Sequence, residues 1–320
     1  MKKDILYTII GGSGFLGSEI CKEMIKKNFK FEILDKDINK YFEEYTNKVD
    51  INDFDKLHDN LNGDYVIHLA AEHKDNLSDN SAYYQANVSG TKNIIEVCEK
   101  KNINNIIFTS SVAVYGLNIN KADEFTNPNP SNDYGKSKLI AENLLKDWSR
   151  KDHKRNLIII RPTAIFGLGN RGNIYNLLNQ INSNFFAMIG KGQNKKSIAF
   201  VSNVASFIVE CIDKNVENEL INYADYPTLN MNKFVKLSRR HLGKKFLFPT
   251  VPYFLGIIIG TVLDIFSYFL PFSFPISRNR VEKFCASSEI LSKNAIRKNF
   301  IPPYDVKSAL KKTINKEFNQ

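Results

Sequence analysis

The chain has 320 residues, of which 43% are hydrophobic and 24% are charged, and its formal net charge is +10. This composition is that of a folded globular protein, and it excludes a disordered, fibrous or polytopic membrane protein. A chain of this length can form about two domains around a sizeable core.

The excess of positive charge is confined to the C-terminal part of the sequence. Residues 1–235 contain 29 Lys and Arg and 29 Asp and Glu, whereas residues 236–320 contain 15 basic and 5 acidic residues. A surface that is basic throughout would indicate nucleic acid, so this confinement argues against a nucleic-acid partner. A solvated Lys-rich tail and a local anionic partner, such as a ligand phosphate or a membrane surface, both remain open.

The four cysteines are far apart in the sequence and form no Cys-x-x-Cys pair. They indicate neither a zinc site nor a disulfide framework, so we expect a reduced cytoplasmic setting and no bound metal. The basic N-terminus and the apolar run after it faintly resemble a signal peptide, but the run is short and ends at glycines. It predicts a first buried strand instead.

Short apolar runs alternate with segments of helical period through the first half of the chain. The apolar runs predict strands at Ile5–Ile10, Phe31–Leu34, Tyr65–Leu69, Ile106–Phe108 and Leu157–Ile160. The segments between them predict helices near residues 15–28, 53–61, 81–101 and 134–149. Because the strands are apolar on both faces, we expect an α/β fold with a doubly wound parallel sheet covered by helices.

The regular alternation weakens after residue 162. Gly-rich and Asn-rich connections at Gly167–Asn173 and Gly190–Asn194 separate short mixed elements there. We therefore predict two domains. The first is residues 1–165, completed by segments that return from the second half of the chain. The second, residues 166–320, is mainly a smaller C-terminal substrate domain.

A glycine-rich turn joins the first predicted strand to the first predicted helix, where Ile9–Gly17 reads IIGGSGFLG. Glycine is needed where the backbone turns sharply and approaches a pyrophosphate, whose charge is met by N–H groups at the helix start. Asp35 ends the second predicted strand. An acid there would accept hydrogen bonds from an adenosine ribose and repel a 2′-phosphate. The sequence thus predicts a Rossmann-like domain that binds NAD in preference to NADP.

A second motif opens the helix predicted near 134–149. Tyr134 and Lys138 are four residues apart, so they lie on one face of that helix. A tyrosine with an ordinary pKa of about 10 is a poor base at neutral pH, but an adjacent ammonium and an oxidised nicotinamide would stabilise its phenolate. Ser111 follows the strand predicted at Ile106–Phe108, at the sheet edge where a doubly wound fold binds its ligands.

The glycine turn, the strand-end serine and Tyr-x-x-x-Lys, in this order, closely resemble the pattern of the extended short-chain dehydrogenase/reductase family, which contains NAD-dependent epimerases and dehydratases. The resemblance implies that Ser111, Tyr134 and Lys138 are catalytic. It implies that NAD is bound by Gly11, Ser13, Gly14, Phe15, Leu16, Gly17, Asp35, Asp50, Ile51, Leu69, Ala70, Ala71, Asn87, Tyr134 and Lys138. In that pattern Asp50 and Ile51 contact adenine, and Asn87 is a structural asparagine. Family members also dimerise through helices that match residues 81–101 and 134–149.

Two positions beside the serine separate the subclasses of this family. Relatives that are 4,6-dehydratases carry an Asp-Glu pair directly after the catalytic hydroxyl, because elimination of water needs an acid and a base beyond the tyrosine. In this sequence the two positions are Val112 and Ala113. Dehydration is therefore disfavoured, which leaves 4-epimerisation, ketoreduction or alcohol oxidation.

A narrower resemblance extends over most of the chain. It involves Ala70–Asp75, Phe108–Leu117, Asn170–Ile181, Ile189–Val204 and Arg280–Ala286. These segments look like those of bacterial enzymes that 4-epimerise N-acetylglucosamine while it is attached through diphosphate to undecaprenol. The resemblance implies that Asn173 and Lys196, with Arg171 as a third candidate, contact the substrate diphosphate, and that Ser111 contacts the sugar.

Between Phe246 and Ser277 the only charged residue is Asp264, and basic residues flank the segment on both sides. Several prolines and glycines interrupt it, which argues against a helix that spans a membrane. Apolar segments between cationic flanks can rest at a membrane interface. A buried helix pair of the second domain is the alternative.

We therefore predict an NAD-dependent isomerase, a 4-epimerase of an N-acetylhexosamine carried on undecaprenyl diphosphate, of the GlcNAc to GalNAc type. The resemblance implies a role in bacterial surface polysaccharide (O-antigen) biosynthesis and a cytoplasmic location, peripheral on the inner membrane. A soluble UDP-GlcNAc or UDP-glucose 4-epimerase and a nucleotide-sugar 4-ketoreductase are the catalytic alternatives. An NAD-binding scaffold without turnover is the third, and such degenerate members typically lose the tyrosine or lysine that this chain retains.

Overall fold

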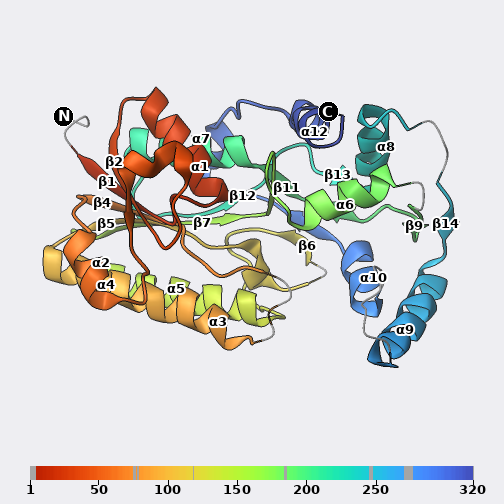
Figure 1. The fold of residues 1–320 in the computed structure, drawn as a ribbon, viewed down its shortest axis with the longest axis horizontal. Coiled ribbons are helices and arrows are strands. Elements are labelled where there is room, and N and C mark those ends of the chain that lie inside the picture. The colour runs from red at the N-terminus through yellow and green to blue at the C-terminus, as the bar shows by residue number, and fades with distance from the viewer. Residues whose placement is uncertain are drawn as a thin grey trace.

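A seven-stranded parallel sheet organises the first half of the protein (Figure 1). The computed structural model describes residues 5–74, 77, 79–117, 119–183, 186–244, 248–269 and 277–319. The strands lie in the order β12-β7-β5-β4-β1-β2-β3, and every neighbouring pair is parallel. They are β1 (Leu6–Ile10), β2 (Lys30–Asp35), β3 (Thr46–Lys48), β4 (Tyr65–His68), β5 (Asn105–Thr109), β7 (Asn156–Pro162) and β12 (Leu220–Tyr223).

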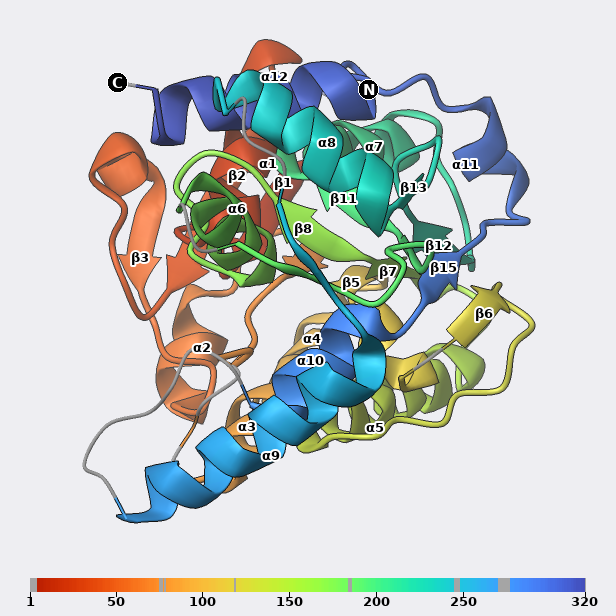
Figure 2. The same cartoon turned by 90° about the vertical axis from the view of Figure 1, so that its right-hand side faces the viewer.

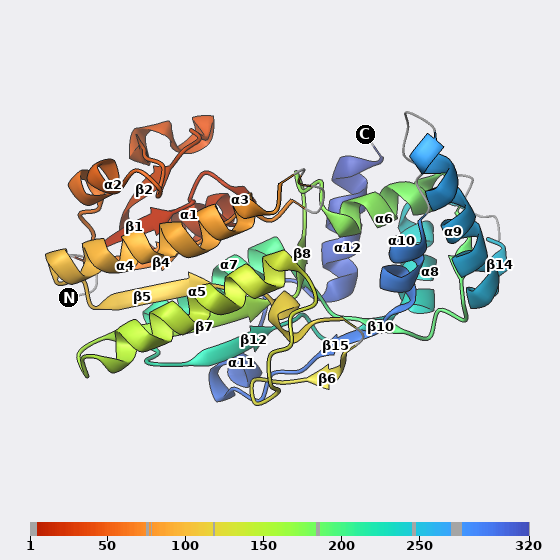
Figure 3. The same ribbon diagram turned by 90° about the horizontal axis from the view of Figure 1, so that it is seen from below.

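Helices cover both faces of this sheet, as Figures 1 and 3 show. The helices of the first half are α1 (Phe15–Lys26), α2 (Phe54–Asn60), α3 (Ser81–Tyr84), α4 (Gly90–Lys101) and α5 (Asp133–Arg150). On one face α1 packs with α7 (Val201–Asp213) against residues such as Ile9, Ile67 and Ile158. On the other face α2, α4 and α5 pack against residues such as Ile10 and Ile106. The alternation of Ile9 and Ile10 explains why the strands are apolar on both faces.

The five strands and the α/β doubly wound fold predicted from the sequence are confirmed. The helices predicted near 15–28, 53–61 and 134–149 are α1, α2 and α5. The helix predicted near 81–101 is three pieces, because a π-helical turn, η3 (Gln85–Ser89), separates α3 from α4. Strands β3 and β12 were not predicted, since β3 is short and polar and β12 lies in the less regular second half.

The second half begins after β7 and builds a smaller body of short strands and helices at the right of Figure 1. Its core contains Phe166, Leu178, Phe234 and Leu310. The remaining helices are α6 (Asn173–Asn182), α8 (Met231–His241), α9 (Tyr253–Phe269), α10 (Arg278–Cys285), α11 (Ala295–Asn299) and α12 (Val306–Glu317). The strands of the second half are β8 (Ala164–Phe166), β9 (Met188–Ile189), β10 (Lys195–Lys196), β11 (Ile198–Phe200), β13 (Leu229–Asn230), β14 (Thr250–Val251) and β15 (Ser288–Ile290). The first half also contains β6 (Ile119–Ala122) and the 3-10 helices η2 (Lys40–Tyr45) and η4 (Val112–Tyr115).

The chain returns to the large sheet twice after leaving it. Helix α7 packs against α1, and β12 forms the sheet edge beside β7. Near the C-terminus β15 pairs in parallel with β6 of the first half. The first 165 residues thus share their sheet and its covering helices with later segments of the chain.

The apolar segment predicted at 246–277 contains helix α9, which lies at one end of the molecule beside α10 (Figure 2). Many of its large apolar side chains are exposed. Within the described residues, no helix has the length and apolar character needed to cross a membrane. The first and last parts of the segment, including Pro271 and Pro275, lie outside the described residues, as do Lys245 and Asp75.

Candidate active site

The glycine-rich turn lies where the strand order reverses, with β1 between β2 and β4. Ligands of doubly wound sheets bind at the carboxyl ends of the strands at such a point. Gly11 has a φ of +85°, and a Cβ there would lie 2.6 Å from the backbone nitrogen of Ala70. A Cβ on Gly17 would lie 2.5 Å from the Cα atom of Gly12. Glycine is therefore required at both positions for β1 to turn directly into α1.

The start of α1 is suited to an anion. Its N-cap residue, Gly14, offers no side-chain acceptor to the first backbone N–H groups of the helix. Such N–H groups, together with the helix dipole, bind phosphate groups. Ser13 precedes the N-cap, and Phe15 and Leu16 are the first two residues of α1, so the three residues predicted to bind NAD lie at a helix start that fits a pyrophosphate.

Asp35 lies at the end of β2, directly beside the turn. Its carboxylate accepts hydrogen bonds from the backbone nitrogens of Ser13, at 3.0 Å, and Asp37, at 3.1 Å. Burial raises the pKa of this carboxyl group, and the two N–H donors counteract part of that effect. Asn39, which the sequence did not single out, donates from Nδ2 to Ser18 Oγ at 2.9 Å and thereby fastens the loop after β2 to α1.

The residues predicted to contact adenine, and the segment predicted to line the cofactor after β4, lie on the two sides of β1 at the same sheet edge. Lys48 of β3 is in register with Asp35, and the backbone nitrogen of Val49 donates to the carbonyl oxygen of Asp35 at 2.9 Å, so Asp50 and Ile51 follow directly after this end of the sheet. On the other side of β1, the backbone nitrogens of Leu69 and Ala70 both donate to the carbonyl oxygen of Ile10, at 2.8 and 3.0 Å. The segment that contains Ala71 is therefore held directly against the glycine turn.

Asn87 connects this segment to the helix that contains Tyr134. It is 1% exposed and lies in the π-helical turn η3. Its Oδ1 accepts from the backbone nitrogen of Glu72 at 2.9 Å, and its Nδ2 donates to the carbonyl of Glu72 and to Ser137 Oγ. Ser137 Oγ in turn donates to the carbonyl oxygen of Tyr134 at 2.9 Å. The predicted structural role of Asn87 matches this bridging position.

The segments that contain Ser111 and Tyr134 are in close contact with each other. Ser111 is the N-cap of η4, and its Oγ accepts from the backbone nitrogen of Ala113 at 3.1 Å, which leaves its own proton available for donation. A Cβ on Gly135 would lie 2.5 Å from the carbonyl oxygen of Ala113. The first turn of α5 therefore lies directly against the segment after Ser111, and Asn132 caps α5 by accepting from Gly135 N at 2.8 Å.

Lys138 is held beneath the same edge of the sheet. It is 2% exposed, and its Nζ donates to the carbonyl oxygen of Thr109 at 2.8 Å. The Nζ atom also lies 4.5 Å from the centre of the Phe108 ring. Burial lowers the pKa of Lys138 to about 7, while the charge of Glu142 opposes this shift. The start of α5, which contains Tyr134 and Lys138, thus packs against the end of β5 and the segment that contains Ser111.

A buried ion pair below this cluster was not predicted as part of the site. Glu142, one turn after Lys138, is fully buried and accepts from Arg161 through two hydrogen bonds. It also accepts from Ser110 Oγ at 2.6 Å. The signal in the sequence was an acid beside Ala141 within the apolar face of α5, together with an arginine at the end of a strand.

The residues predicted to contact diphosphate lie in the second half of the chain. Asn173 is exposed at the first position of α6. Lys196 Nζ donates to the carbonyl oxygen of Lys283 at 2.8 Å, and burial lowers the pKa of Lys196 to about 8. Arg171 forms an ion pair with Glu317 at 2.8 Å and its guanidinium lies over the ring of Tyr175. To bind a diphosphate, Arg171 would have to leave Glu317.

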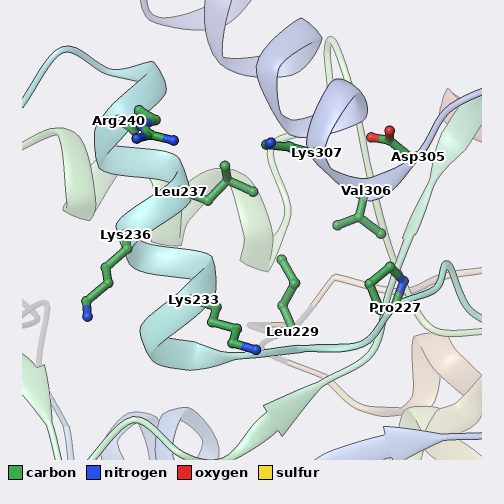
Figure 4. Close-up of a pocket in the computed structure, with 9 residues that line it drawn as sticks. All are labelled: Pro227, Leu229, Lys233, Lys236, Leu237, Arg240, Asp305, Val306 and Lys307. Atoms are coloured by element: carbon green, nitrogen blue, oxygen red, sulfur yellow. The ribbon is translucent and has the colours of Figure 1, made fainter.

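A cavity of about 640 Å³ lies elsewhere, between α8 and α12 (Figure 4). Figure 4 shows basic side chains around apolar ones, and the lining residues are Pro227, Leu229, Lys233, Lys236, Leu237, Arg240, Asp305, Val306 and Lys307. None of the predicted site residues is among them. The residues predicted to form the site therefore lie outside this cavity.

The chain is similar to known proteins over most of its length. The model of the "NAD dependent epimerase/dehydratase family" matches residues 7–224. The chain is 43% identical over 314 residues to N-acetyl-alpha-D-glucosaminyl-diphospho-ditrans,octacis-undecaprenol 4-epimerase of Escherichia coli O157:H7, and the match covers 97% of this chain and 94% of that protein.

Solved structures share the fold at low sequence identity. A UDP-glucose 4-epimerase from Thermotoga maritima with UDP-glucose superposes with a TM-score of 0.76 at 18% identity, covering 97% of this chain and 98% of the other. A UDP-glucose 4-epimerase from Thermus thermophilus in complex with NAD gives a TM-score of 0.74 at 15% identity, with 97% and 98% covered. These similarities establish the fold.

Proposed function

Because the chain belongs to the NAD-dependent epimerase/dehydratase family, we propose that it inverts C4 of an N-acetylhexosamine linked through diphosphate to undecaprenol, in the GlcNAc to GalNAc sense. The cofactor is NAD and the reaction is an isomerisation. The observation that supports the proposal is the packing of the start of α5, with Tyr134 and Lys138, against the end of β5 and the segment that contains Ser111. The 43% identity over nearly the whole chain supports the lipid-linked substrate.

The proposed chemistry begins with proton transfer from the 4-hydroxyl group of the sugar to Tyr134. NAD, which the glycine turn and Asp35 would hold, would supply the acceptor for the hydride of C4 and the source of its return to the opposite face of the sugar. Ser111 donates a hydrogen bond to the C4 oxygen, and the ammonium of Lys138 stabilises the phenolate of Tyr134. Because Lys138 is anchored on Thr109 and beside Glu142, its position relative to Tyr134 is fixed before the substrate binds.

Epimerisation also needs the 4-keto sugar to turn over while its diphosphate stays in place. Asn173 and Lys196 are proposed to hold the diphosphate by charge-assisted and neutral hydrogen bonds. Lys196 lies beside Lys283 of α10, so the proposed diphosphate site is built against that helix. Arg171 is proposed only as a third contact, since it is paired with Glu317.

Three further proposals concern organisation. Residues 1–165, completed by α7 and β12, form the NAD-binding domain, and residues 166–320 form mainly the substrate domain. A homodimer through α4 and α5 is supported by their adjacent position on one face of the sheet and by Ile140, which is 40% exposed. The place of action is the cytoplasmic face of the inner membrane, where a lipid-linked sugar of surface polysaccharide synthesis would be met.

A soluble UDP-sugar 4-epimerase is the alternative, because several proteins with this fold are epimerases of UDP-sugars. The same catalytic residues serve both substrates. The deciding experiment offers UDP-GlcNAc and undecaprenyl-diphospho-GlcNAc side by side and measures epimer formation. We expect turnover of the lipid-linked sugar, whereas exclusive turnover of UDP-GlcNAc would establish the alternative. Steady oxidation of NADPH would indicate a ketoreductase instead.

A further inference from the structure

Helix α9 has one face that is packed against the rest of the protein and one face that is exposed. One face contains Gly256 and Gly260, where a Cβ would lie 2.6 Å from Ile189 Cγ2 and 2.7 Å from the backbone nitrogen of Arg278, respectively. These glycines let α9 lie directly on β9 and on the start of α10. Figure 2 shows the two helices side by side.

The other face of α9 consists of large apolar side chains that remain exposed. They are 40% to 62% exposed: Tyr253, Phe254, Leu255, Ile258, Ile259, Val262, Ile265 and Phe266. A helix of 17 residues is about 25 Å long, so this face is an apolar strip several turns in length. Apolar side chains gathered in this way mark a surface for a partner or a membrane.

The one charge of α9 lies at its junction with α10. Asp264 is one turn beyond Gly260, and its Oδ2 accepts from the backbone nitrogen of Arg278 at 3.0 Å. Ser277 Oγ accepts from Arg280 N at 3.2 Å at the same helix start. Asp264 therefore fixes the hairpin of α9 and α10 and does not interrupt the apolar strip.

Cationic side chains lie next to this strip. Arg278, Arg280 and Lys283 of α10 are exposed, and Glu282 pairs with Arg278 at 2.9 Å. An amphipathic helix that is too short to span a bilayer binds its interface through apolar burial and through attraction of cations to anionic lipids. The combination of apolar length and adjacent cations distinguishes a lipid surface from an ordinary protein partner.

We propose that the outward face of α9 inserts into the interface of an anionic phospholipid bilayer, with Arg280 and Lys283 at the headgroups. This inference rests on the proposed function, because it gives the partner surface at which a lipid-linked sugar is met. The same hairpin is in contact with the proposed diphosphate site, since the backbone carbonyl oxygen of Lys283 accepts a hydrogen bond from Lys196 Nζ. Cys285 Sγ, 3.4 Å from the carbonyl of Ile189, further joins α10 to β9. Docking of α9 therefore places the diphosphate site close to the membrane.

The test measures co-sedimentation of the NAD-loaded full chain with vesicles. We expect binding to an equal mixture of phosphatidylglycerol and phosphatidylcholine, release by high salt, and weaker binding to phosphatidylcholine alone. The double variant Phe254→Ser/Ile258→Ser should lower binding about tenfold or more. Ile301→Ser is the matched control, since Ile301 is 88% exposed outside α9.

The charge contribution is tested by Arg280→Gln/Lys283→Gln, which should lower binding to the anionic vesicles only. Lys151→Gln/Lys154→Gln is its control, because it removes the same charge from an exposed loop region. Equal vesicle binding by wild type and both α9-hairpin variants would overturn the proposal. The proposal would also be overturned if the wild-type protein did not bind vesicles but self-associated in sedimentation velocity, and if Phe254→Ser/Ile258→Ser caused that assembly to dissociate.

This readout is independent of the reaction. If the protein binds vesicles but does not epimerise undecaprenyl-diphospho-GlcNAc, the proposed function fails while the docking surface stands. If the protein epimerises a short-chain, water-soluble diphosphate-linked sugar but does not bind vesicles, the proposed docking surface is wrong and the proposed reaction is supported.

Discussion

Arg161 donates to both carboxylate oxygens of Glu142, from Nε at 2.8 Å and from Nη2 at 2.5 Å, in the interior beneath the proposed catalytic residues. The same guanidinium donates to the hydroxyl of Tyr115 at 2.8 Å, and that hydroxyl donates to Asn222 of β12. The pair therefore joins α5 to β7 and, through Tyr115, to the returning strand β12. The pair lies beneath the segments that contain Ser110, Ser111 and Lys138, and Ser110 Oγ donates to Glu142.

Replacement of Glu142 by Gln should be strongly destabilising. It leaves the charge of Arg161 buried without a partner, which typically costs about 3 to 5 kcal/mol of unfolding free energy. Urea unfolding of wild type and variant measures the loss. Glu96→Gln is the control, because Glu96 forms an exposed pair with Lys100. An unchanged midpoint for Glu142→Gln would contradict a structural role for the pair.

The same pair predicts an acid dependence of stability. Burial alone would raise the pKa of Glu142, but the hydrogen bonds and charge of Arg161 lower it on balance. A carboxyl group with a lowered folded pKa stabilises the fold above its unfolded pKa of about 4.3, and this contribution is lost as the pH falls through the folded value. Unfolding free energies of wild type and Glu142→Gln should therefore converge in acid.

Tyr134→Phe should abolish nearly all turnover and leave NAD binding intact. It removes only the hydroxyl that takes the proton, a role worth about 10² to 10⁴ in rate. NAD affinity is measured by fluorescence titration and turnover by epimer formation. Tyr84→Phe is the matched control, since its hydroxyl donates to Asp133 and not to the reacting centre. Full activity of Tyr134→Phe would refute the assignment.

Lys138 should make stability depend on pH in the neutral to alkaline range. Its folded pKa of about 7 lies below its ordinary value of 10.5, so between these values the unfolded chain binds more protons than the folded one. The unfolding free energy of the NAD-free chain should therefore rise across this range. Lys138→Met should lack this rise and be the more stable protein below pH 7. Parallel pH profiles of the two proteins would contradict the prediction.

Asp35→Ser should weaken NAD binding and relax the discrimination against NADP. The substitution removes the carboxylate that faces Ser13 and that would repel a 2′-phosphate. We expect about a tenfold loss of NAD affinity and a comparable gain for NADP, or about 1.4 kcal/mol each. Asp37→Ser is the control two residues away. An unchanged ratio of the two affinities would place the ribose elsewhere.

The large sheet was predictable because its information is local. Runs such as Ile106–Phe108 are apolar on both faces and therefore predict buried strands. The glycines at positions 11 and 17 indicate a tight turn of the backbone. The spacing of Tyr134 and Lys138 likewise fixes a shared helix face. Each of these inferences needs only neighbouring residues, and the described elements agree with them.

Other features depend on residues that are far apart in the chain. Nothing local shows that Gly135 meets Ala113, that Glu142 pairs with Arg161, or that β12 returns to the sheet beside β7. The helix expected near 81–101 contains a π-helical turn, and Asn87 in that turn bonds to Glu72 and Ser137, which are long-range partners. Such contacts arise from packing, which a pattern of neighbours does not contain.

The sequence by itself determined the doubly wound sheet, the tight glycine turn proposed to bind NAD and the identity of the three proposed catalytic side chains. It left open whether residues 246–277 are buried or face outward, because an apolar run is compatible with both. For helix α9, only the tertiary structure decided this, since Gly256 and Gly260 place one face of α9 against β9 and α10 while the other face stays exposed. Burial is a property of the partners that surround a helix, and those partners are set by the fold.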